Sequence, residues 1–238
     1  MKIGLLECDH VLDRFRHVAG DYRDMFAALF NHHARQAAMQ TFDVCNGEFP
    51  SSLDACDAYL TTGSRFSAYD DVDWIHALKN FVRRIHGAKK PFVGVCFGHQ
   101  IMAEALGGKV TKAETGWGAG VHNLEVIRHE AWMQPERSGC GLQYMHQDQV
   151  AQLPEDGVVI GRSEHCPVAM FRAGDFMLGI QAHPEFTKDY SEALLLDRVE
   201  RIGAGRVKVA LASLYQPTDE PVVAKWIVEF LGGRKQEL

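Results

Sequence analysis

The sequence lacks the features that mark membrane, secreted or nucleic-acid-binding proteins. No apolar run among its 238 residues approaches the ~18 residues that a membrane span needs. The apolar run at the N-terminus meets Glu7 and Asp9 too early to form the core of a signal peptide. Lys and Arg number 25 against 31 Asp and Glu, and this net charge of −6 argues against binding of phosphate backbones. We therefore expect a cytoplasmic protein that binds neither membranes nor nucleic acids.

Cysteine is too sparse and too scattered to form a disulfide scaffold. The chain has six cysteines, no C-x-x-C pair and no zinc-ligand spacing. The pair His146-x-Asp148 has no third ligand at a suitable distance in the sequence, and His10 is expected on a solvated face, so no metal site is predicted. A free cysteine is usually a small buried hydrophobic residue. Cys96 is the exception, for reasons given below.

The chain shows no repeat, no linker rich in Pro, Gly or Ser, and no block of like charge. These absences favour a single domain over residues 1–238, with a core to about residue 186 and a helical region over about 187–238. Apolar periodicity predicts helices at Asp21–Ala38, Trp74–Ile85, Gln100–Leu106, Tyr190–Ile202, Val207–Tyr215 and Val222–Leu231. Short apolar runs predict strands at Lys2–Glu7, Thr41–Cys45, Ala58–Thr62 and Pro91–Val95.

The middle of the chain has a different pattern. Its segments are short, β-like and punctuated by Gly and Pro, without a helix between them: Leu124–Arg128, Val158–Gly161, Val168–Phe171 and Met177–Gln181. Alternating strands and helices predict an open, mostly parallel sheet with helices on both faces. The middle segments predict an antiparallel β extension of that sheet.

The strongest functional signal surrounds Cys96. The apolar strand Pro91–Val95 runs into Gly94-Val-Cys96-Phe-Gly98 and then into a helix, which is the arrangement of a nucleophile elbow with sulfur in place of oxygen. Glycines are needed because the turn is sharp and neighbouring side chains would clash. The N-terminus of the following helix favours a thiolate over a thiol. The pattern predicts that Cys96 is a nucleophile.

A thiolate nucleophile needs a base, and His183 is the best of the twelve histidines. It follows the apolar run that ends at Gln181, so it is expected at the end of a strand, where open α/β sheets build their sites. Glu185 lies two residues further on and can orient the imidazole, as the third member of a triad does.

These motifs resemble those of one enzyme family. Cys96-Phe-Gly-His-Gln100 followed by His183-Pro-Glu185 is similar to the class I (triad) glutamine amidotransferases, which release ammonia from glutamine through a γ-glutamyl thioester. The resemblance runs from about Lys2 to Phe186 and implies a flavodoxin-like amidotransferase fold. Within the family, the chain looks most like the stand-alone subgroup near the glutaminase domain of GMP synthase, which includes γ-glutamyl peptidases.

The resemblance also implies roles for further residues. The turn Thr62-Gly63-Ser64 is similar to the family's glycine-rich turn, so the backbone N–H groups of Gly63 and Phe97 are the expected oxyanion hole. The remaining expected substrate contacts are Gln100, His146 and Gln147. This chemistry needs no cofactor.

Four functions are compatible with these motifs. The first is a hydrolase that cleaves a γ-glutamyl amide, either glutamine or a γ-glutamyl compound, through a thioester on Cys96. The second is a free-standing glutaminase subunit that delivers ammonia to a separate synthetase partner. The third is a cysteine hydrolase with a different acyl substrate, and the fourth is a non-catalytic binding or regulatory module on the same fold.

Overall fold

The computed structural model describes residues 1–33 and 38–232. Its main sheet has nine strands in the spatial order β2 (Ala38–Phe42), β1 (Lys2–Leu6), β3 (Ala58–Thr61), β4 (Phe92–Val95), β11 (Met177–Ile180), β10 (Met170–Ala173), β9 (Gly157–Arg162), β6 (Gly118–Val126) and β7 (Gly139–His146). β5 (Lys109–Lys112) and β8 (Asp148–Gln152) form a separate pair. The helices are α1 (Arg16–Ala19), α2 (Tyr22–His33), α3 (Asp73–Gly87), α4 (Phe97–Ala105), α5 (Lys188–Asp197), α6 (Val199–Ile202), α7 (Ala204–Ser213) and α8 (Glu220–Gly232).

The main sheet has a parallel half and an antiparallel half. β2, β1, β3, β4 and β11 pair in parallel. From β11 onward, β10, β9, β6 and β7 pair in antiparallel fashion. The predicted parallel sheet with an antiparallel extension is therefore confirmed. Because parallel strands end at the same edge, the residues after β3, β4 and β11 meet there.

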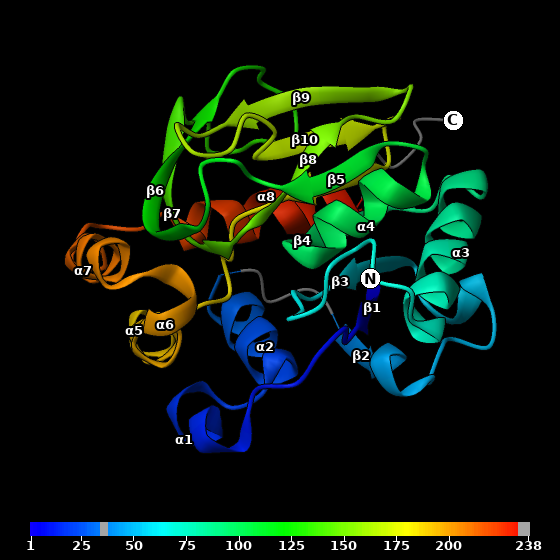
Figure 1. The fold of residues 1–238 in the computed structure, drawn as a ribbon. Coiled ribbons are helices and arrows are strands. Elements are labelled where there is room, and N and C mark those ends of the chain that lie inside the picture. Colours follow the sequence, from blue (N-terminus) through cyan, green and yellow to red (C-terminus); the bar gives the residue numbers. More distant parts are fainter. Residues whose placement is uncertain (34–37, 233–238) are drawn as a thin grey trace.

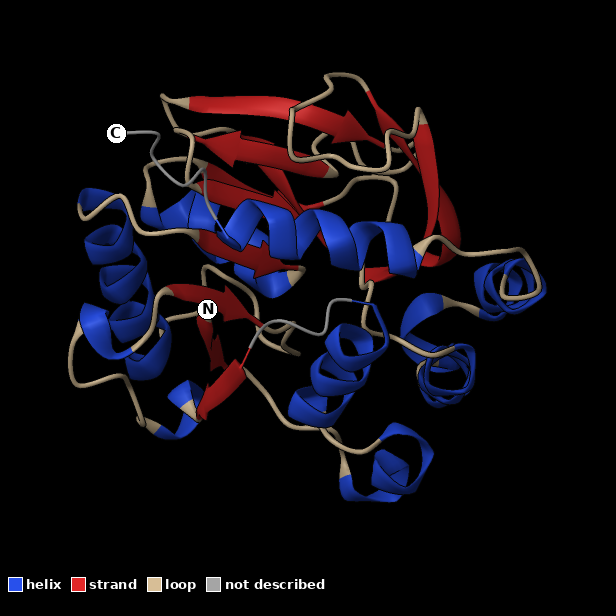
Figure 2. Ribbon diagram, turned by 180° about the vertical axis from the view of Figure 1, so that it is seen from behind, coloured by secondary structure: helices blue, strands red, loops and turns tan. Residues whose placement is uncertain are grey.

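Helices cover both faces of the parallel half, as predicted (Figures 1 and 2). On one face, α3 and α4 pack in one apolar cluster with strand residues such as Tyr59 and Phe92. On the other face, α2 and α8 pack around Leu5 and Val93, with Phe26 and Trp226 buried in that cluster. The last helix thus belongs to the core layers, although it follows the strands by some forty residues of chain.

A third apolar cluster lies beside the sheet rather than on it. It joins α1, α2 and the helices α5 to α7 to Ala119, Val121 and Met145 of β6 and β7. Figure 1 shows α5, α6 and α7 together beside the edge formed by β6 and β7. Within the described residues, no helix is long and apolar enough to cross a membrane.

Two predicted boundaries are wrong near the N-terminus. Ala38, predicted as the end of a helix, begins strand β2, and the predicted helical residues 34–37 lie outside the described residues. The strand predicted at Thr41–Cys45 lies three residues earlier, at β2, and a 3-10 turn follows at Val44–Asn46. β2 is an edge strand with no fully buried residue, so its apolar pattern is weak.

The antiparallel strands of the main sheet and of the separate β5–β8 pair were predicted only in part. β9, β10 and β11 overlap their predicted segments, and β6 extends the predicted Leu124 segment back to Gly118. β5, β7 and β8 were missed, since their mixed polar and apolar residues resemble loops. The predicted helix Tyr190–Ile202 is divided at Arg198 into α5 and α6.

Candidate active site

The turn from β4 into α4 has the geometry of a nucleophile elbow. Cys96 has φ 51° and ψ −100°, a left-handed conformation that a side chain rarely adopts. A Cβ at Gly94 would clash with the Gly98 backbone, and a Cβ at Gly98 would clash with Thr61 Oγ1. Both glycines are therefore required by close packing. The strained turn places Cys96 at the N-terminus of α4, where the helix dipole stabilises negative charge.

The five cysteines other than Cys96 are held as thiols by their surroundings. Burial raises the pKa of the Cys45, Cys140 and Cys166 thiols to about 12. Burial also raises the pKa of Cys8 and of Cys56. These thiols are poor nucleophiles at neutral pH, because a thiolate is the reactive form.

His183 and Glu185 follow β11 at the same edge of the sheet. His183 Nδ1 donates to Glu185 Oε1 over 2.8 Å, and their side chains are 4% and 0% exposed. The ring of Phe186 stacks on the imidazole, with 3.8 Å between ring centroids. The backbone N–H of His183 donates to the carbonyl of Gln143 on β7 over 2.8 Å. The imidazole is thus held by a carboxylate, an aromatic face and a strand of the antiparallel half.

The charges around His183 favour its protonated form. Burial alone would lower its pKa, but negative charge on Cys96 and on Glu185 outweighs burial and raises the pKa of the imidazole. An imidazolium between a sulfur and a carboxylate can donate a proton from Nε2 while Glu185 holds Nδ1. A protonated His183 can therefore stabilise a thiolate by its charge and can also act as a proton donor.

Gly63 allows the turn after β3 to pack against both Cys96 and His183. A Cβ at Gly63 would lie 2.7 Å from His183 Cε1 and 3.6 Å from Cys96 Cβ, so only a glycine fits there. The hydroxyl of Thr62 accepts from the Cys8 N–H and donates to the Gly63 carbonyl, both over 2.9 Å. The turn is thereby fixed next to the elbow. Phe97 directly follows Cys96 and is the first residue of α4.

The three predicted substrate contacts line one cavity with Cys96. This cavity has a volume of about 150 Å³ and includes Gln100, His146 and Gln147. Both His146 Nδ1 and Gln100 Nε2 donate to the carbonyl of Asp148, over 3.0 and 2.8 Å. Burial lowers the pKa of His146 to about 3, so its ring is neutral. The side chains of Gln100 and His146 thus brace the segment that carries Gln147 and Asp148.

Gln181 contacts the sulfur, although no sequence motif pointed to it. Its Nε2 lies 3.6 Å from Cys96 Sγ, and its Oε1 accepts from Gln100 over 3.1 Å. Gln181 is fully buried directly after β11. A polar residue at the end of an apolar run, two positions before His183, was the available signal.

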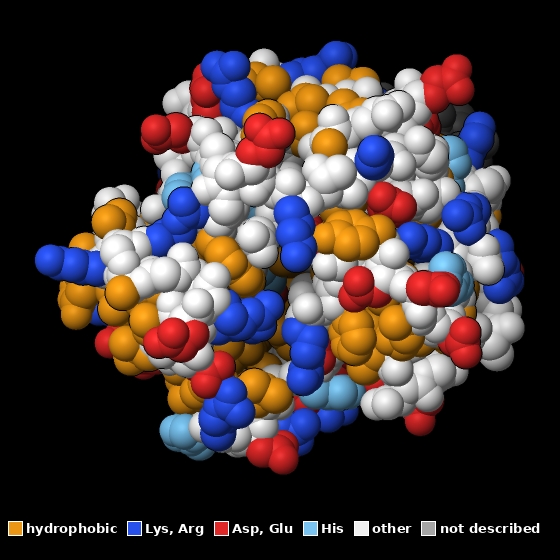
Figure 3. Space-filling view, in the orientation of Figure 1, with side chains coloured by type: hydrophobic (Ala, Val, Ile, Leu, Met, Phe, Trp, Pro, Cys, Tyr) orange, Lys and Arg blue, Asp and Glu red, His pale blue; other side chains and the backbone are white. Residues whose placement is uncertain are grey.

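The basic residues of the cavity were also missed. Arg65, Lys112, Arg198 and Arg201 line it together with Trp117. Figure 3 shows Lys and Arg side chains gathered around the hollow in the middle of this face. They come from separate segments of the chain, so no spacing in the sequence joins them.

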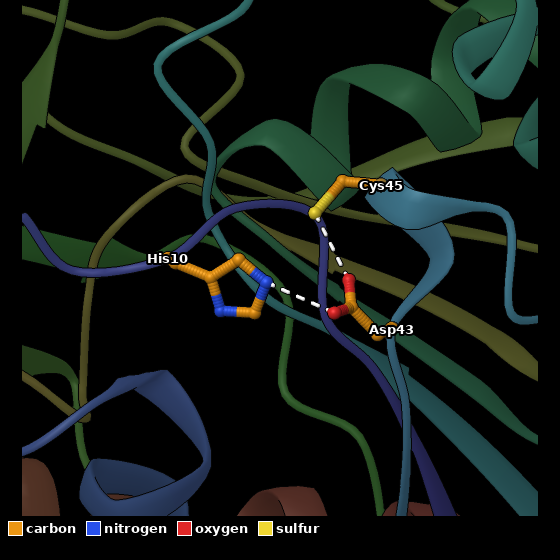
Figure 4. Close-up of side chains that lie close together, drawn as sticks. All are labelled: His10, Asp43 and Cys45. Carbon is orange, nitrogen blue, oxygen red and sulfur yellow. Dashed lines mark hydrogen bonds and ion pairs between the residues drawn. The ribbon is translucent and has the colours of Figure 1, made fainter.

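His10 does not lie on a solvated face, and that expectation was wrong. Its ring lies between two carboxylates, with Nδ1 3.0 Å from Asp21 and Nε2 3.1 Å from Asp43. Cys45 Sγ donates to Asp43 over 3.2 Å (Figure 4). Partial burial alone would lower the pKa of His10, but the two carboxylates raise it. We interpret this cluster as an ion-pair network that joins the loop after β1, the start of α2 and the turn after β2.

Comparison with known proteins identifies the family. Residues 66–199 match the class-I glutamine amidotransferase family. The chain belongs to this family. It is 33% identical over 194 residues to γ-glutamyl peptidase 4 of Arabidopsis thaliana, a match that covers 78% of this chain and 74% of that protein.

More distant matches agree with this family. A GMP synthase (glutamine-hydrolyzing) of Bacteroides fragilis is 27% identical, over 69% of this chain and 32% of that protein. The fold matches the crystal structure of a glutamine amidotransferase from Thermotoga maritima, with a TM-score of 0.75, 18% identity, and coverage of 97% of this chain and 96% of that chain. The resemblance stated from the sequence motifs, and the fold that it implied, are confirmed.

Proposed function

We propose that this amidotransferase-family chain hydrolyses γ-glutamyl amide bonds, with glutamine as one substrate, through a γ-glutamyl thioester on Cys96. The observation that carries the proposal is the strained elbow, which holds Cys96 beside an imidazole that Glu185 orients. The similarity to a plant γ-glutamyl peptidase supports the acyl group. No metal or cofactor is required by this reaction.

The first half of the reaction forms the thioester. The Cys96 thiolate attacks the γ-carbonyl carbon, and the oxygen becomes an oxyanion in the tetrahedral intermediate. In this proposal the N–H groups of Gly63 and Phe97 bind that oxyanion, a contribution of about 2.7–4 kcal/mol for each donor. The C–N bond then breaks, and His183 donates its Nε2 proton to the leaving amine.

The second half releases glutamate. Neutral His183 takes a proton from water, and the resulting hydroxide attacks the thioester carbon. The C–S bond breaks, the thiolate returns to Cys96, and the proton remains on His183. Glu185 keeps the imidazole in one orientation through both halves.

Delivery of ammonia to a synthetase partner is the second candidate. The match to a GMP synthase (glutamine-hydrolyzing) favours ammonia delivery. This chain matches only about a third of that protein, so the rest of that protein has no counterpart in the match. An ammonia-delivering subunit keeps its product enclosed and turns glutamine over slowly when it is alone. A self-sufficient hydrolase needs neither a partner nor enclosure, and it accepts leaving groups larger than ammonia.

The test compares substrates on the isolated chain. We expect measurable kcat/KM values for glutamine and for γ-glutamyl dipeptides, read as free glutamate. Undetectable dipeptide cleavage, together with glutaminase activity that rises when a synthetase is added, would favour the ammonia-delivering subunit. No release of glutamate from any γ-glutamyl compound would leave a binding module or a different acyl substrate.

A further inference from the structure

The cavity beside Cys96 carries more positive charge than a γ-glutamyl group alone requires. Lys112 comes from β5, Arg198 joins α5 to α6, and Arg201 lies in α6. Asp148 is the carboxylate in the lining, and the Ser67 hydroxyl donates to it over 2.6 Å. Basic side chains thus concentrate at this cavity in a chain whose net charge is −6.

Most of these cations have no carboxylate within ion-pair distance in the described part of the chain, although Lys112 lies opposite Asp148 in the β5–β8 pair. Arg65 also lines the cavity, but its Nε lies 2.9 Å from both carboxylate oxygens of Asp9. Within residues 1–33 and 38–232, neither Lys112, Arg198 nor Arg201 forms an ion pair with a carboxylate. Cations that line one cavity without a counter-charge repel one another, which favours an anionic ligand.

The proton donor determines the side of Cys96 on which the leaving group departs. The leaving amine must take its proton from His183, so it lies on the imidazole side of the sulfur. The His183 ring stacks on Phe186, and Phe186 packs edge-on against Tyr190 of α5, 4.8 Å between centroids. The first turn of α5 therefore packs on the imidazole side, and Arg198, which follows the C-terminal end of α5, lines the same cavity.

The wall that carries Arg201 is held in place by other contacts. The Arg201 guanidinium lies 5.4 Å from the centroid of Trp117, a cation–π distance. Arg206 of α7 donates to the carbonyls of Thr115 and Trp117. The loop before β6 and the helices after α5 thereby form one positioned surface above the cavity.

We propose that Lys112, Arg198 and Arg201 form a subsite for a carboxylate on the leaving group. This inference rests on the proposed function and narrows its substrate class. The γ-glutamyl group brings one α-carboxylate, which a single cation can pair, whereas three cations that line the cavity have no carboxylate at ion-pair distance. The preferred substrates are then γ-glutamyl peptides with a free carboxyl group after the scissile bond. Glutamine, whose leaving group is ammonia, gains nothing from this subsite.

The test uses two substrates that differ only in one charge. γ-Glutamylglycine has a carboxylate on its leaving group, and γ-glutamylglycinamide has a neutral amide at the same place. We expect kcat/KM for the acid to exceed that for the amide by about tenfold to a hundredfold, the range for a hydrogen bond to a charged group. In Arg198→Gln, Arg201→Gln and Lys112→Gln, this ratio should fall toward one.

A matched control is Arg137→Gln. Arg137 is exposed in the connection between β6 and β7, at the end of these strands opposite the Gly118–His146 pair that borders the cavity. The control should keep the acid-to-amide ratio of the wild type. Equal turnover of acid and amide by the wild type would overturn the subsite. Equal losses on both substrates in the variants would also overturn it, because the cations would then hold the α-carboxylate.

A binding measurement separates this inference from the proposed function. Calorimetry with Cys96→Ala measures affinity for the same two compounds without turnover. Tighter binding of the acid with no hydrolysis by the wild type would uphold the subsite and contradict the proposed function. Hydrolysis of both compounds with no difference in affinity or rate would uphold the function and contradict the subsite.

Discussion

The two halves of the main sheet contribute differently to the candidate site. The parallel half supplies Gly63, Cys96 and His183, which follow the ends of its strands. The antiparallel half supplies no member of the proposed triad, but Gln143 of β7 holds the His183 backbone, and Met145 and His146 line the cavity. The difference suggests that reaction chemistry depends on the parallel half, and that positioning and selectivity depend on the antiparallel half and the helices packed against it.

The largest effect is expected at the elbow. Cys96→Ala should lower the rate of glutamate release by about 10⁶-fold, as loss of a nucleophile does in other triads. Cys140→Ala removes a buried thiol from the antiparallel half and should keep the activity of each folded molecule. Comparable losses in both variants would show that the two halves do not divide the roles in this way.

The next effect concerns Glu185, the acid that is proposed to orient His183. Glu185→Gln keeps the shape of the side chain but removes its charge, so turnover should fall by about 10⁴-fold, with a measurable remainder. Thermal unfolding checks that the variant folds. Wild-type turnover in Glu185→Gln would contradict the role of the hydrogen bond to His183.

The packing of the parallel half can be tested through its glycines. Gly98→Ala forces a Cβ against Thr61 Oγ1, and overpacking of this kind should cost about 3 kcal/mol of unfolding free energy. Gly87→Ala, at the end of α3, meets nothing within 4 Å and should be neutral or slightly stabilising. Urea denaturation measures both. If the two substitutions had equal cost, the elbow would be looser than the structure indicates.

A smaller effect is expected from the antiparallel half. The Gln143 side chain donates to the Phe186 carbonyl over 3.0 Å, next to the ring that stacks on His183. Gln143→Ala should lower kcat by about threefold to tenfold, which corresponds to one ordinary hydrogen bond, with little change in KM. Gln152→Ala, on an exposed position of β8, is the matched control. A loss as large as that of Glu185→Gln would place catalytic chemistry in the antiparallel half.

The smallest effect is a dependence of stability on pH. The carboxylates of Asp21 and Asp43 raise the pKa of His10, so its charged form stabilises the folded state. This stabilisation is complete below the ordinary His pKa of about 6.5 and is lost as pH rises through the raised value. The stability difference between wild type and His10→Gln should therefore shrink from about 1 kcal/mol as pH rises above neutrality.

A matched substitution checks that this effect belongs to the network. His76 pairs with Asp71 on the surface, where the His76 side chain is 54% exposed. His76→Gln should change stability little across the same pH range, because exposed pairs contribute little. A constant difference between wild type and His10→Gln across that range would show that His10 acts through packing rather than charge.

The parallel half was predictable because its signals are local. Gly94, Cys96 and Gly98 encode the elbow within five residues, and the strands that meet there are short apolar runs between helices. The positions of His183 and Glu185 followed from one further motif. Thr62 illustrates a finer detail: its hydroxyl fixes the Gly63 turn through contacts to Cys8 and Gly63, which the sequence of the turn alone does not indicate.

The rest depends on contacts between distant segments. β7 was missed, although its Gln143 holds the His183 backbone, because its residues alternate too weakly to stand out from a loop. The network around His10 joins residues 33 positions apart, and the cavity cations Lys112 and Arg198 lie on segments separated by more than eighty residues. Such clusters can be recognised only when the topology of the fold is known. The cytoplasmic location and the absence of a cofactor stay predictions.

The central claim is that Cys96 carries the γ-glutamyl group during turnover. The most direct test is to mix the protein with a γ-glutamyl dipeptide, quench with acid during turnover, and analyse its peptides by mass spectrometry. We expect one added glutamyl group on the peptide that contains Cys96, and none in Cys96→Ala. Turnover with a glutamyl group on another cysteine, or with no covalent adduct under conditions where deacylation is slow, would contradict the claim.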